Sequence, residues 1–518
     1  MEKWYPNQPR AIDKLLLAML KRIVLKLVAA LARKKIYKTA NNPVQTQKKQ
    51  LKKLIKKALP TKFGIDHNFK KIFDYEGFKS QVPIRGYEDI KNYIQLIKQG
   101  EESILWPGRP IYFAITSGTT SGSKFIPITK DSLPNHLNGA KNAILIYVAN
   151  TGKTNFIDGK FIFIQGNPIL TKISGIPTGR LSGISAHHIP HYMKKNMLPT
   201  WETNTIDDWE NKVDNIINET INQNMTLISG IPSWLQMYFE KIKSITGNKI
   251  SSTFPNFNLL IYGGVNFKPY EKKFSSLIGK KIDTIEIFPA SEGFFAFQDR
   301  INSEGLLLIL DAGIFYEFIS VEDYRKDKIK RISIEDVKIN KDYLMIISTS
   351  AGLWGYNTGD TVRFVSLRPH RIIVTGRIKQ QLSAFGEHVI VKEVEQAMQK
   401  AIQLSEALVS EFTVAPRFKS KNHKACHEWY IEFDKEPNDL NDFALNLDSE
   451  LQTQNKYYKE LILGKIIQKP DIKIVLKGGF KKYMKNAGKL GGQNKIPKIA
   501  NDRLIVDRIT KLNLLKRI

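Results

Sequence analysis

Short runs of β-branched and aromatic residues recur along the middle of the chain, and each ends in Gly, Ser or Pro. These runs are predicted strands at 111–115, 161–164, 259–262, 284–288 and 343–348. Longer segments between several of them, such as 209–222 and 232–245, have the apolar spacing of an amphipathic helix. Strands that alternate with helices in this way are typical of α/β layers with sites at the strand ends.

The first part of the chain is predicted to be helical. In 46–59 apolar residues recur at helical spacing from Leu51 to Ala58, and lysines take the other face. The apolar and basic stretch 11–35 is predicted to be an amphipathic helix docked on the body of the protein, with association with an anionic lipid surface as the alternative. Its longest apolar run, 15–20, is far shorter than a membrane span, and no signal-peptide cleavage site follows. We therefore expect no transmembrane segment.

A boundary is predicted at the Thr-Gly-Arg turn of 375–377, directly after a strand at 371–374. Beyond this turn the pattern restarts with a helix at 392–401 and with strand-like stretches at 407–414 and 428–433. A basic tail follows them. This restart is typical of a second, smaller domain.

Length and composition agree with two folded domains. The chain has 518 residues, of which 42% are hydrophobic and 25% charged, so a substantial core is expected. We predict a mixed α/β fold, with a large N-terminal domain of layered sheets and helices in 1–375 and a smaller α+β domain in 376–518, joined by a hinge. The single cysteine, Cys426, excludes an intrachain disulfide and a Cys-based zinc site, which favours a reducing, cytoplasmic compartment.

The chain is strongly basic. Its 79 Lys and Arg residues against 50 Asp and Glu residues give a net charge of +29, which attracts polyanions in general. Where basic residues cluster they tend to fall on one side of an amphipathic helix, so we favour solvated helix faces over a nucleic-acid site. A basic nucleic-acid or surface-binding protein is the alternative from another functional class, although the sequence offers no recognisable binding motif for it.

The strongest signal for chemistry is a loop directly after the strand at 111–115. Its sequence is Thr116-Ser117-Gly118-Thr119-Thr120-Ser121-Gly122-Ser123-Lys124. Small residues let the backbone approach an anion, hydroxyls and N–H groups donate hydrogen bonds, and Lys124 neutralises charge, which are the requirements of a phosphate cradle. The spacing differs from that of a Walker A loop. A plain surface turn is the alternative interpretation.

Two further predicted loops, later in the sequence, each contain a carboxylate that supports this interpretation. The segment 288–293 places Glu292 beside the hydroxyl of Ser291, which suits Mg²⁺ bridged to phosphates. The segment 356–360 places Asp360 on a predicted turn, where a carboxylate can accept both hydroxyls of a ribose. Together with the first loop, these segments indicate a nucleotide site.

These three motifs resemble those of the acyl-adenylate-forming superfamily and, within it, of the auxin-responsive acyl-acid amido synthetases (the Gretchen Hagen family) in a bacterial-type form. The resemblance runs from about 106 to the C-terminus. It implies that the loop from Thr116 to Lys124 is the first ATP motif and that Asp360 holds the ribose. It further implies adenine contacts from the second motif and from a glycine turn, with Glu292 as the metal ligand. The implied adenine-side residues are Phe288, Ala290, Ser291 and Gly264.

The resemblance extends into the C-terminal domain. Residues 375–379 resemble the hinge of the superfamily, and Arg377 is counted among the nucleotide-binding residues. Lys379 stands where many relatives carry Asp. The segment 493–497 is similar to the family's Gln-x-Lys-x-Pro segment, whose lysine can reach the active site.

The resemblance therefore implies two catalytic lysines, Lys495 and Lys124, and the neighbouring Lys485 and Lys489 are rivals of Lys495. It implies a ligase that uses ATP and Mg²⁺ to activate a carboxylic acid as acyl-AMP and then transfers the acyl group to an amine, such as that of an amino acid. The products besides the amide are AMP and pyrophosphate. The runner-up is an acyl-CoA-type ligase with a thiol acceptor. We expect small-molecule partners, no specific nucleic acid and, by default, a monomer.

Two groups of histidines are interpreted as structural. For His187, His188 and His191, no Cys or carboxylate lies at metal-ligand spacing. His423 and His427 lie on either side of Cys426, but the segment 428–433 that follows has the pattern of a strand, which favours packing. The segment 230–234 opens an aromatic helix that is interpreted as core, with the wall of an acyl pocket as the alternative.

Overall fold

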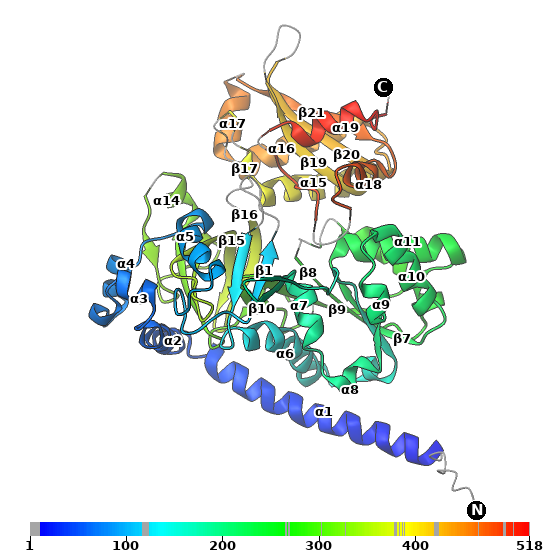
Figure 1. Cartoon of the computed structure of the whole chain (residues 1–518). Coiled ribbons are helices and arrows are strands. Elements are labelled where there is room, and N and C mark those ends of the chain that lie inside the picture. The colour runs from blue at the N-terminus through cyan, green and yellow to red at the C-terminus, as the bar shows by residue number, and fades with distance from the viewer. Residues whose placement is uncertain are drawn as a thin grey trace, which may run out of the picture.

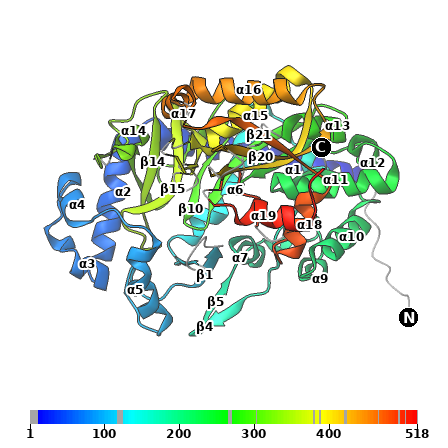
Figure 2. The same cartoon turned by 90° about the horizontal axis from the view of Figure 1, so that it is seen from above.

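The computed structural model describes residues 11–116, 124–264, 267, 270–301, 303–326, 328–377, 381–382, 384–385, 387, 389–418, 424–464, 466–490, 494–500 and 502–516. Figure 1 shows a body built around one large sheet, with a smaller C-terminal unit above it and the long helix α1 (Ala11–Ala40) along its base. Seen from above, the C-terminal elements cover part of the large sheet (Figure 2). The first helix and the C-terminal unit therefore lie at opposite ends of the molecule.

After α1, which runs along the base of the body, the N-terminal helices cover its antiparallel side (Figure 1). Their bounds are α1 Ala11–Ala40, α2 Pro43–Ala58, α3 Lys62–Asp66, α4 Tyr75–Gln81 and α5 Tyr87–Lys98, with a short 3-10 helix at Phe69–Lys71. The predicted apolar face of α2 is buried. Buried Gln47 on the same helix donates to the carbonyl oxygens of Leu310 and Ile314 at 2.8 and 2.9 Å and accepts from the Tyr316 N–H at 2.8 Å. These hydrogen bonds fix α2 to the large sheet.

The large sheet has the strand order β13-β12-β14-β15-β16-β11-β10-β9-β8-β7-β3-β6. Strand pairs from β9 to β6 are parallel and those from β9 to β13 are antiparallel, so the sheet changes polarity at β9. The strand bounds are β3 Lys160–Phe163, β6 Met197–Leu198, β7 Met225–Gly230, β8 Leu259–Gly263, β9 Asp283–Ala290, β10 Gly293–Phe297, β11 Leu306–Leu308, β12 Ile314–Ser320, β13 Arg331–Ile332, β14 Asp342–Thr349, β15 Tyr356–Leu367 and β16 His370–Arg377. Ligands in open α/β sheets bind beyond the carboxyl ends of the parallel strands. A ligand site is therefore expected near the carboxyl end of β8.

A smaller sheet and several helices surround this centre. The smaller sheet has the order β2-β1-β5-β4, with bounds β1 Tyr112–Thr116, β2 Lys124–Ile128, β4 Thr171–Ile173 and β5 Ile176–Gly179. The helices are α6 Leu133–Thr151, α7 Leu181–His187, α8 His191–Lys194, α9 Trp201–Asn204, α10 Trp209–Thr220, α11 Pro232–Thr246, α12 Ile250–Thr253, α13 Glu271–Ile278 and α14 Val321–Arg325, with a 3-10 helix at Asn155–Asp158. Apolar side chains of α10, α11 and α13 pack together with those of β7 and β8.

The C-terminal unit is a three-stranded sheet with helices. Its strands are β19 Leu408–Arg417, β20 Cys426–Lys435 and β21 Gln468–Val475, preceded by the short pair β17 Gln381–Leu382 and β18 Val389–Ile390. Its helices are α15 Val391–Ser405, α16 Leu440–Gln454, α17 Lys456–Leu463, α18 Gly479–Asn486 and α19 Leu504–Lys511. The segment 494–500 runs along the edge of β19, where the Val414 N–H donates to the Lys498 carbonyl and the Ala500 N–H donates to the Val414 carbonyl, both at 2.9 Å. The predicted basic tail is therefore a folded part of this unit.

The mixed α/β fold predicted from the sequence is confirmed, and the strands and helices named from periodicity are present within a few residues of their predicted bounds. Two predicted turns are wrong. Residues 375–377 are the end of β16 and residues 356–360 are the start of β15, and these strands pair so that Asp360 lies opposite Arg377. The reason is that cross-strand pairing outweighs the turn preference of Gly, Thr and Asn in these segments.

Candidate functional site

A cavity of about 2920 Å³ lies between the large sheet and the C-terminal unit. Its lining contains each predicted site residue that the structure describes: Thr116, Lys124, Gly264, Phe288, Ala290, Ser291, Glu292, Asp360, Arg377 and Lys495. The other predicted phosphate-loop residues, Ser117, Gly118, Thr119, Thr120, Ser121 and Gly122, lie outside the described residues. The fold thus brings three separate motifs and one C-terminal lysine to a single cavity.

The two ends of the predicted phosphate loop are fixed by strand pairing. Thr116 closes β1 and lies opposite Lys124, which opens β2. The Phe125 N–H donates to the hydroxyl of Tyr87 at 2.9 Å, and the Lys124 Nζ lies 5.7 Å from the centre of the Tyr87 ring. Tyr87 was not predicted from the sequence, because its position on α5 carries no local signal of a contact with β2.

Glu292 lies in the tight turn between β9 and β10. Ala290 pairs with Gly293, so Ser291 and Glu292 form the turn itself. Phe288 and Ala290 belong to β9 rather than to a loop after it. Burial raises the pKa of Glu292, the nearby Asp360 adds to this increase, and the positive charges of Arg377 and Lys124 oppose it. In such a setting, a nearby cation stabilises the ionised form of the carboxyl group.

Asp360 and Arg377 form an ion pair across β15 and β16. The Arg377 Nε donates to the Asp360 Oδ1 at 2.6 Å, and the Asp360 side chain is only 7% exposed, against 50% for Arg377. The carboxylate of Asp360 raises the pKa of Arg377 above its ordinary value. Gly359, with a φ of 80°, lies within β15 just before Asp360, where the pairing of β15 with β14 shifts register, and glycine adopts this backbone conformation readily. The pair therefore presents a charged donor and a carboxylate side by side at the cavity wall.

Lys495 comes to this wall from the C-terminal unit. Its Nζ donates to the carbonyl oxygen of Gly264 at the end of β8. Burial and the charge of Arg377 lower the pKa of Lys495 to about 8, although Asp360 opposes the shift. Of the two alternative lysines, Lys485 pairs with Glu210 at 2.5 Å, and Lys489 lines the same cavity as an exposed side chain. Of the three lysines, Lys495 is the one brought to the Asp360–Arg377 pair.

Ion pairs that were not predicted from the sequence join the C-terminal unit to the body across the cavity. Lys273 on α13 pairs with Glu240 of α11 at 2.6 Å and with Asp434 of β20. Glu210 of α10 pairs with Lys481 at 2.9 Å and with Lys485 at 2.5 Å on α18. Hydrogen bonds from Lys485 and Lys481 lower the pKa of Glu210 to about 2. These contacts hold the C-terminal unit in the position that places Lys495 in the cavity.

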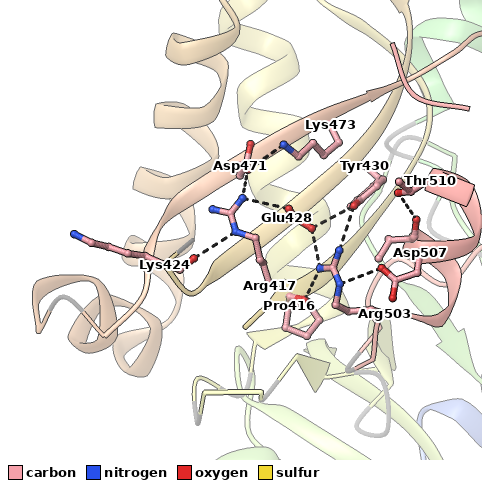
Figure 3. Close-up of polar contacts among 11 residues, drawn as sticks. Pro416, Arg417, Lys424, Glu428, Tyr430, Asp471, Lys473, Arg503, Asp507 and Thr510 are labelled. Atoms are coloured by element: carbon pink, nitrogen blue, oxygen red, sulfur yellow. Dashed lines mark hydrogen bonds and ion pairs between the residues drawn. The ribbon is translucent and has the colours of Figure 1, made fainter. Parts of the chain in front are cut away.

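The segment that carries Lys495 is anchored on its C-terminal side. Buried Lys498 pairs with Glu411 and lies 5.4 Å from the ring centre of Tyr270, which belongs to the body. After the segment, Arg503 donates to Glu428 and to the Pro416 carbonyl, both at 2.8 Å, within the polar network of Figure 3. Lys495 is therefore positioned by the fold of the C-terminal unit rather than carried on a free end.

The remaining candidates have structural surroundings. His187 contacts the Pro168 carbonyl at 2.9 Å and His188 contacts the Tyr112 hydroxyl at 3.0 Å. Buried His427 contacts the Glu387 carboxylate at 2.9 Å, and His423 lies outside the described residues. Trp234 packs against Trp209 and also lines the cavity, so both interpretations of its helix agree with its position.

Within the described residues, no group of three or more His, Cys, Asp or Glu side chains is arranged to hold a metal ion. A site with one carboxylate, Glu292, still matches the chemistry of Mg²⁺, which takes one or two protein carboxylates and completes its shell with water and substrate phosphates. In the same part of the chain, no helix is both long and apolar enough to cross a membrane.

Three regions match the domains of one family. The GH3 family N-terminal domain matches residues 32–208, the GH3 family central domain matches 307–377, and the GH3 family C-terminal domain matches 392–504. Together these matches cover more than half of the chain.

Two curated relatives from Arabidopsis thaliana carry the same family name. Indole-3-acetic acid-amido synthetase GH3.15 is 24% identical over 386 residues, which are 60% of this chain and 64% of the relative, so that match spans less than two thirds of the relative's length. Indole-3-acetic acid-amido synthetase GH3.3 is 22% identical over 538 residues, covering 87% of this chain and 88% of the relative.

Solved structures share the architecture. The GH3.15 acyl acid amido synthetase aligns with a TM-score of 0.76 at 18% identity over 93% of this chain and 95% of that chain. A 2-hydroxyisobutyryl-CoA ligase in its postadenylation state aligns with a TM-score of 0.55 at 11% identity, over 93% of this chain and 91% of that chain. At these identities the likeness describes the fold.

Proposed function

The chain belongs to the GH3 family, and from this premise we propose that it is an ATP-dependent ligase that activates a carboxylic acid as acyl-AMP and joins the acyl group to an amine. The observation that supports this proposal is the convergence of Lys124, Glu292, Asp360, Arg377 and Lys495 on one cavity between the two parts of the molecule. These residues supply the positive charges and the carboxylates that a bound nucleotide triphosphate requires.

In the first half-reaction, an oxygen of the substrate carboxylate attacks the α-phosphorus of ATP, and pyrophosphate leaves. Asp360 accepts the ribose hydroxyls, and Arg377 is held beside it at the α-phosphate end. Lys124 and the loop from Thr116 neutralise the phosphates. Lys495 stabilises the negative charge that develops at the α-phosphate. Positioning and electrostatics supply most of the catalysis of such a transfer.

Glu292 is the proposed ligand of Mg²⁺, with Ser291 beside it. When bound, the metal spreads the negative charge of the phosphates. The raised pKa of Glu292 agrees with this role, because a carboxyl group that is costly to ionise in the empty cavity ionises readily beside a divalent cation. Phe288, Ala290 and Gly264 are proposed to border the adenine.

In the second half-reaction, the nitrogen of an amine attacks the carbonyl carbon of acyl-AMP, and AMP leaves with the bonding electron pair. We propose that, between the two half-reactions, the C-terminal unit that follows β16 rotates on the large domain about a hinge at 377–379, which removes Lys495 from the cavity. Cys426 is buried and burial raises its pKa to about 11, so direct transfer to the amine is favoured over a cysteinyl thioester. A monomer in a reducing, cytoplasmic compartment completes the proposal.

Exchange of labelled pyrophosphate into ATP tests adenylation. With Mg²⁺ and a panel of aromatic, fatty and benzoate-type acids, exchange should require one class of acid and should disappear in Asp360→Ala. With the responsive acid, product analysis in the presence of amino acids or coenzyme A then distinguishes an amide from a thioester. A thioester product would show that the acceptor is a thiol and not an amine. If the protein binds ATP but catalyses no exchange with any acid, the proposed ligase activity is contradicted.

The pH dependence of adenylation follows from the lowered pKa of Lys495. The cationic form neutralises charge and is the major form below a pH of about 8 in the free enzyme. The kcat/KM for ATP should therefore be level below this pH and fall about tenfold per pH unit above it. Lys495→Arg should remove this falling limb, because an arginine stays charged. A limb that persists at the same pH in Lys495→Arg would contradict the assignment.

Docking of the C-terminal unit should be weakened by Asp434→Asn, which removes the partner of Lys273 across the cavity. Both side chains are largely buried, so we expect the adenylation rate to fall about three- to tenfold, with no loss in amide formation from supplied acyl-AMP. Asp214→Asn is the matched control, since its partner Lys241 lies in the same domain. Equal losses in the two variants would contradict a role in docking.

A further inference from the structure

Helix α1 has two apolar faces, and only one of them packs on the protein. The inner face lies against α6 through partly or fully buried residues such as Leu25, Ala29 and Ile36. The outer face consists of side chains that are 46–69% exposed: Met19, Leu20, Ile23, Val24, Leu27, Val28 and Leu31. At the helical period these residues cluster on the side opposite the inner face. The helix therefore presents a continuous apolar strip to solvent.

Polar contacts hold α1 in this orientation. Arg22 pairs with Asp158 at 2.5 Å, the Arg33 guanidinium donates to the Ala149 carbonyl at 3.3 Å, and the Tyr37 hydroxyl donates to Asp299. Because these contacts lie along the length of the helix, α1 cannot turn its outer face inward without breaking them. The exposed strip is thus a fixed feature of the folded protein.

The charges around the strip all have one sign. From Met19 to Ala40 the helix contains no Asp or Glu, and its exposed lysines are Lys21, Lys26, Lys34, Lys35 and Lys38. At the helical period, Lys21 and Lys26 border the strip on its two sides, and the other three continue it toward the end of the helix. An apolar face bordered by lysines is typical of a helix that lies in the interface of an anionic bilayer.

We propose that the outer face of α1 docks this protein on the surface of an anionic lipid bilayer, with the helix parallel to the membrane plane. A second copy of the chain fits this face poorly, because pairing would bring lysines together in a protein whose net charge is +29. The strip is also broader than the narrow seam of a coiled coil. In Figure 1, α1 lies on the side of the body opposite the C-terminal unit, so docking leaves that unit free.

Co-sedimentation of the full chain with vesicles tests the proposal. The protein should bind vesicles of phosphatidylcholine mixed with phosphatidylserine and should not bind vesicles of phosphatidylcholine alone. The combined change of Leu20→Ser, Leu27→Ser and Leu31→Ser should lower the partition coefficient at least about tenfold. Lys21→Gln with Lys26→Gln should lower it about fivefold per lysine. Pyrophosphate exchange and the melting temperature should be unchanged in both variants, since the altered side chains are exposed.

The matched control is Lys49→Gln with Lys52→Gln, which removes the same charge from exposed lysines on α2, where no apolar strip accompanies them. This control should bind vesicles like the natural chain. A loss equal to that of the α1 variants would show a general attraction of the basic protein and overturn the proposal. No binding to mixed vesicles would overturn it too. So would a dimer in light scattering that the three serine substitutions dissociate, since the face would then belong to a second copy.

Discussion

Lys495→Ala is expected to lower acid-dependent pyrophosphate exchange by about 10²- to 10³-fold. A loss of this size is usual when an enzyme loses one positioned hydrogen-bond donor that stabilises charge in the transition state. The Nζ of Lys495 reaches the carbonyl of Gly264 and lies near Asp360 and Arg377. Alanine leaves the nucleotide site of the large domain intact. The KM for ATP should therefore change little, and the decrease should appear in kcat for exchange.

The assay for amide formation separates this role from general damage. With chemically prepared acyl-AMP and an amine, Lys495→Ala should form the amide at nearly the natural rate, because Lys495 is proposed to act only in the first half-reaction. Lys489→Ala is the matched control from the same region, and it should keep its exchange activity. If Lys489→Ala shows the large loss and Lys495→Ala does not, the catalytic lysine has been assigned wrongly.

Asp360→Ala should weaken nucleotide binding by at least about 100-fold, because the carboxylate is proposed to accept two ribose hydroxyls and hydrogen bonds to a charged group contribute about 1.5–3 kcal/mol each. The substitution also leaves the Arg377 guanidinium without its 2.6 Å partner. Calorimetry with AMP measures the loss, and pyrophosphate exchange should fall by at least the same factor. Asp360→Asn should be intermediate, since the amide still accepts a hydrogen bond without the charge.

An equivalent ion pair nearby provides the control. Asp342 of β14 accepts two hydrogen bonds from Arg363 of β15, at 2.8 and 2.7 Å. Asp342→Asn should lower the melting temperature about as much as Asp360→Asn while leaving AMP affinity unchanged. If both variants lose AMP affinity equally, the effect of Asp360 is on the sheet and not on the ribose.

The sequence predicted the parts of this site that depend on local chemistry. Phosphates, metal ions and ribose each require particular residue types, and the sequence shows these types close together. They are the hydroxyls and glycines after β1, Glu292 after a strand, and Asp360 near a glycine. Lys495 was identified by resemblance to a family segment, and its distance from the other motifs along the chain gave no geometric support until the fold was known.

What the sequence could not predict depends on long-range pairing. Thr375–Arg377 has the composition of a turn, yet the register of β15 and β16 makes it a strand end. The contacts of Glu210 with α18 and of Lys273 with Asp434 join residues far apart in the chain, and each is an ordinary surface charge when viewed alone. For α1 the sequence left two interpretations open, docking on the body and association with an anionic lipid surface, and only the structure shows that one apolar face is packed while the other is exposed.

Among the described residues, the apolar clusters that pack on the large sheet are formed by residues up to Ile372 in the sequence. The exception is Leu490, which is partly buried at the margin of one cluster. Domains fold as units, N-terminal parts first, while the ribosome is still adding residues. We therefore expect Asp360 and Arg377 to pair before Lys495 has been translated. If these residues have the proposed roles, a nascent chain at that stage should bind a nucleotide but activate an acid about 10²- to 10³-fold more slowly than the full chain.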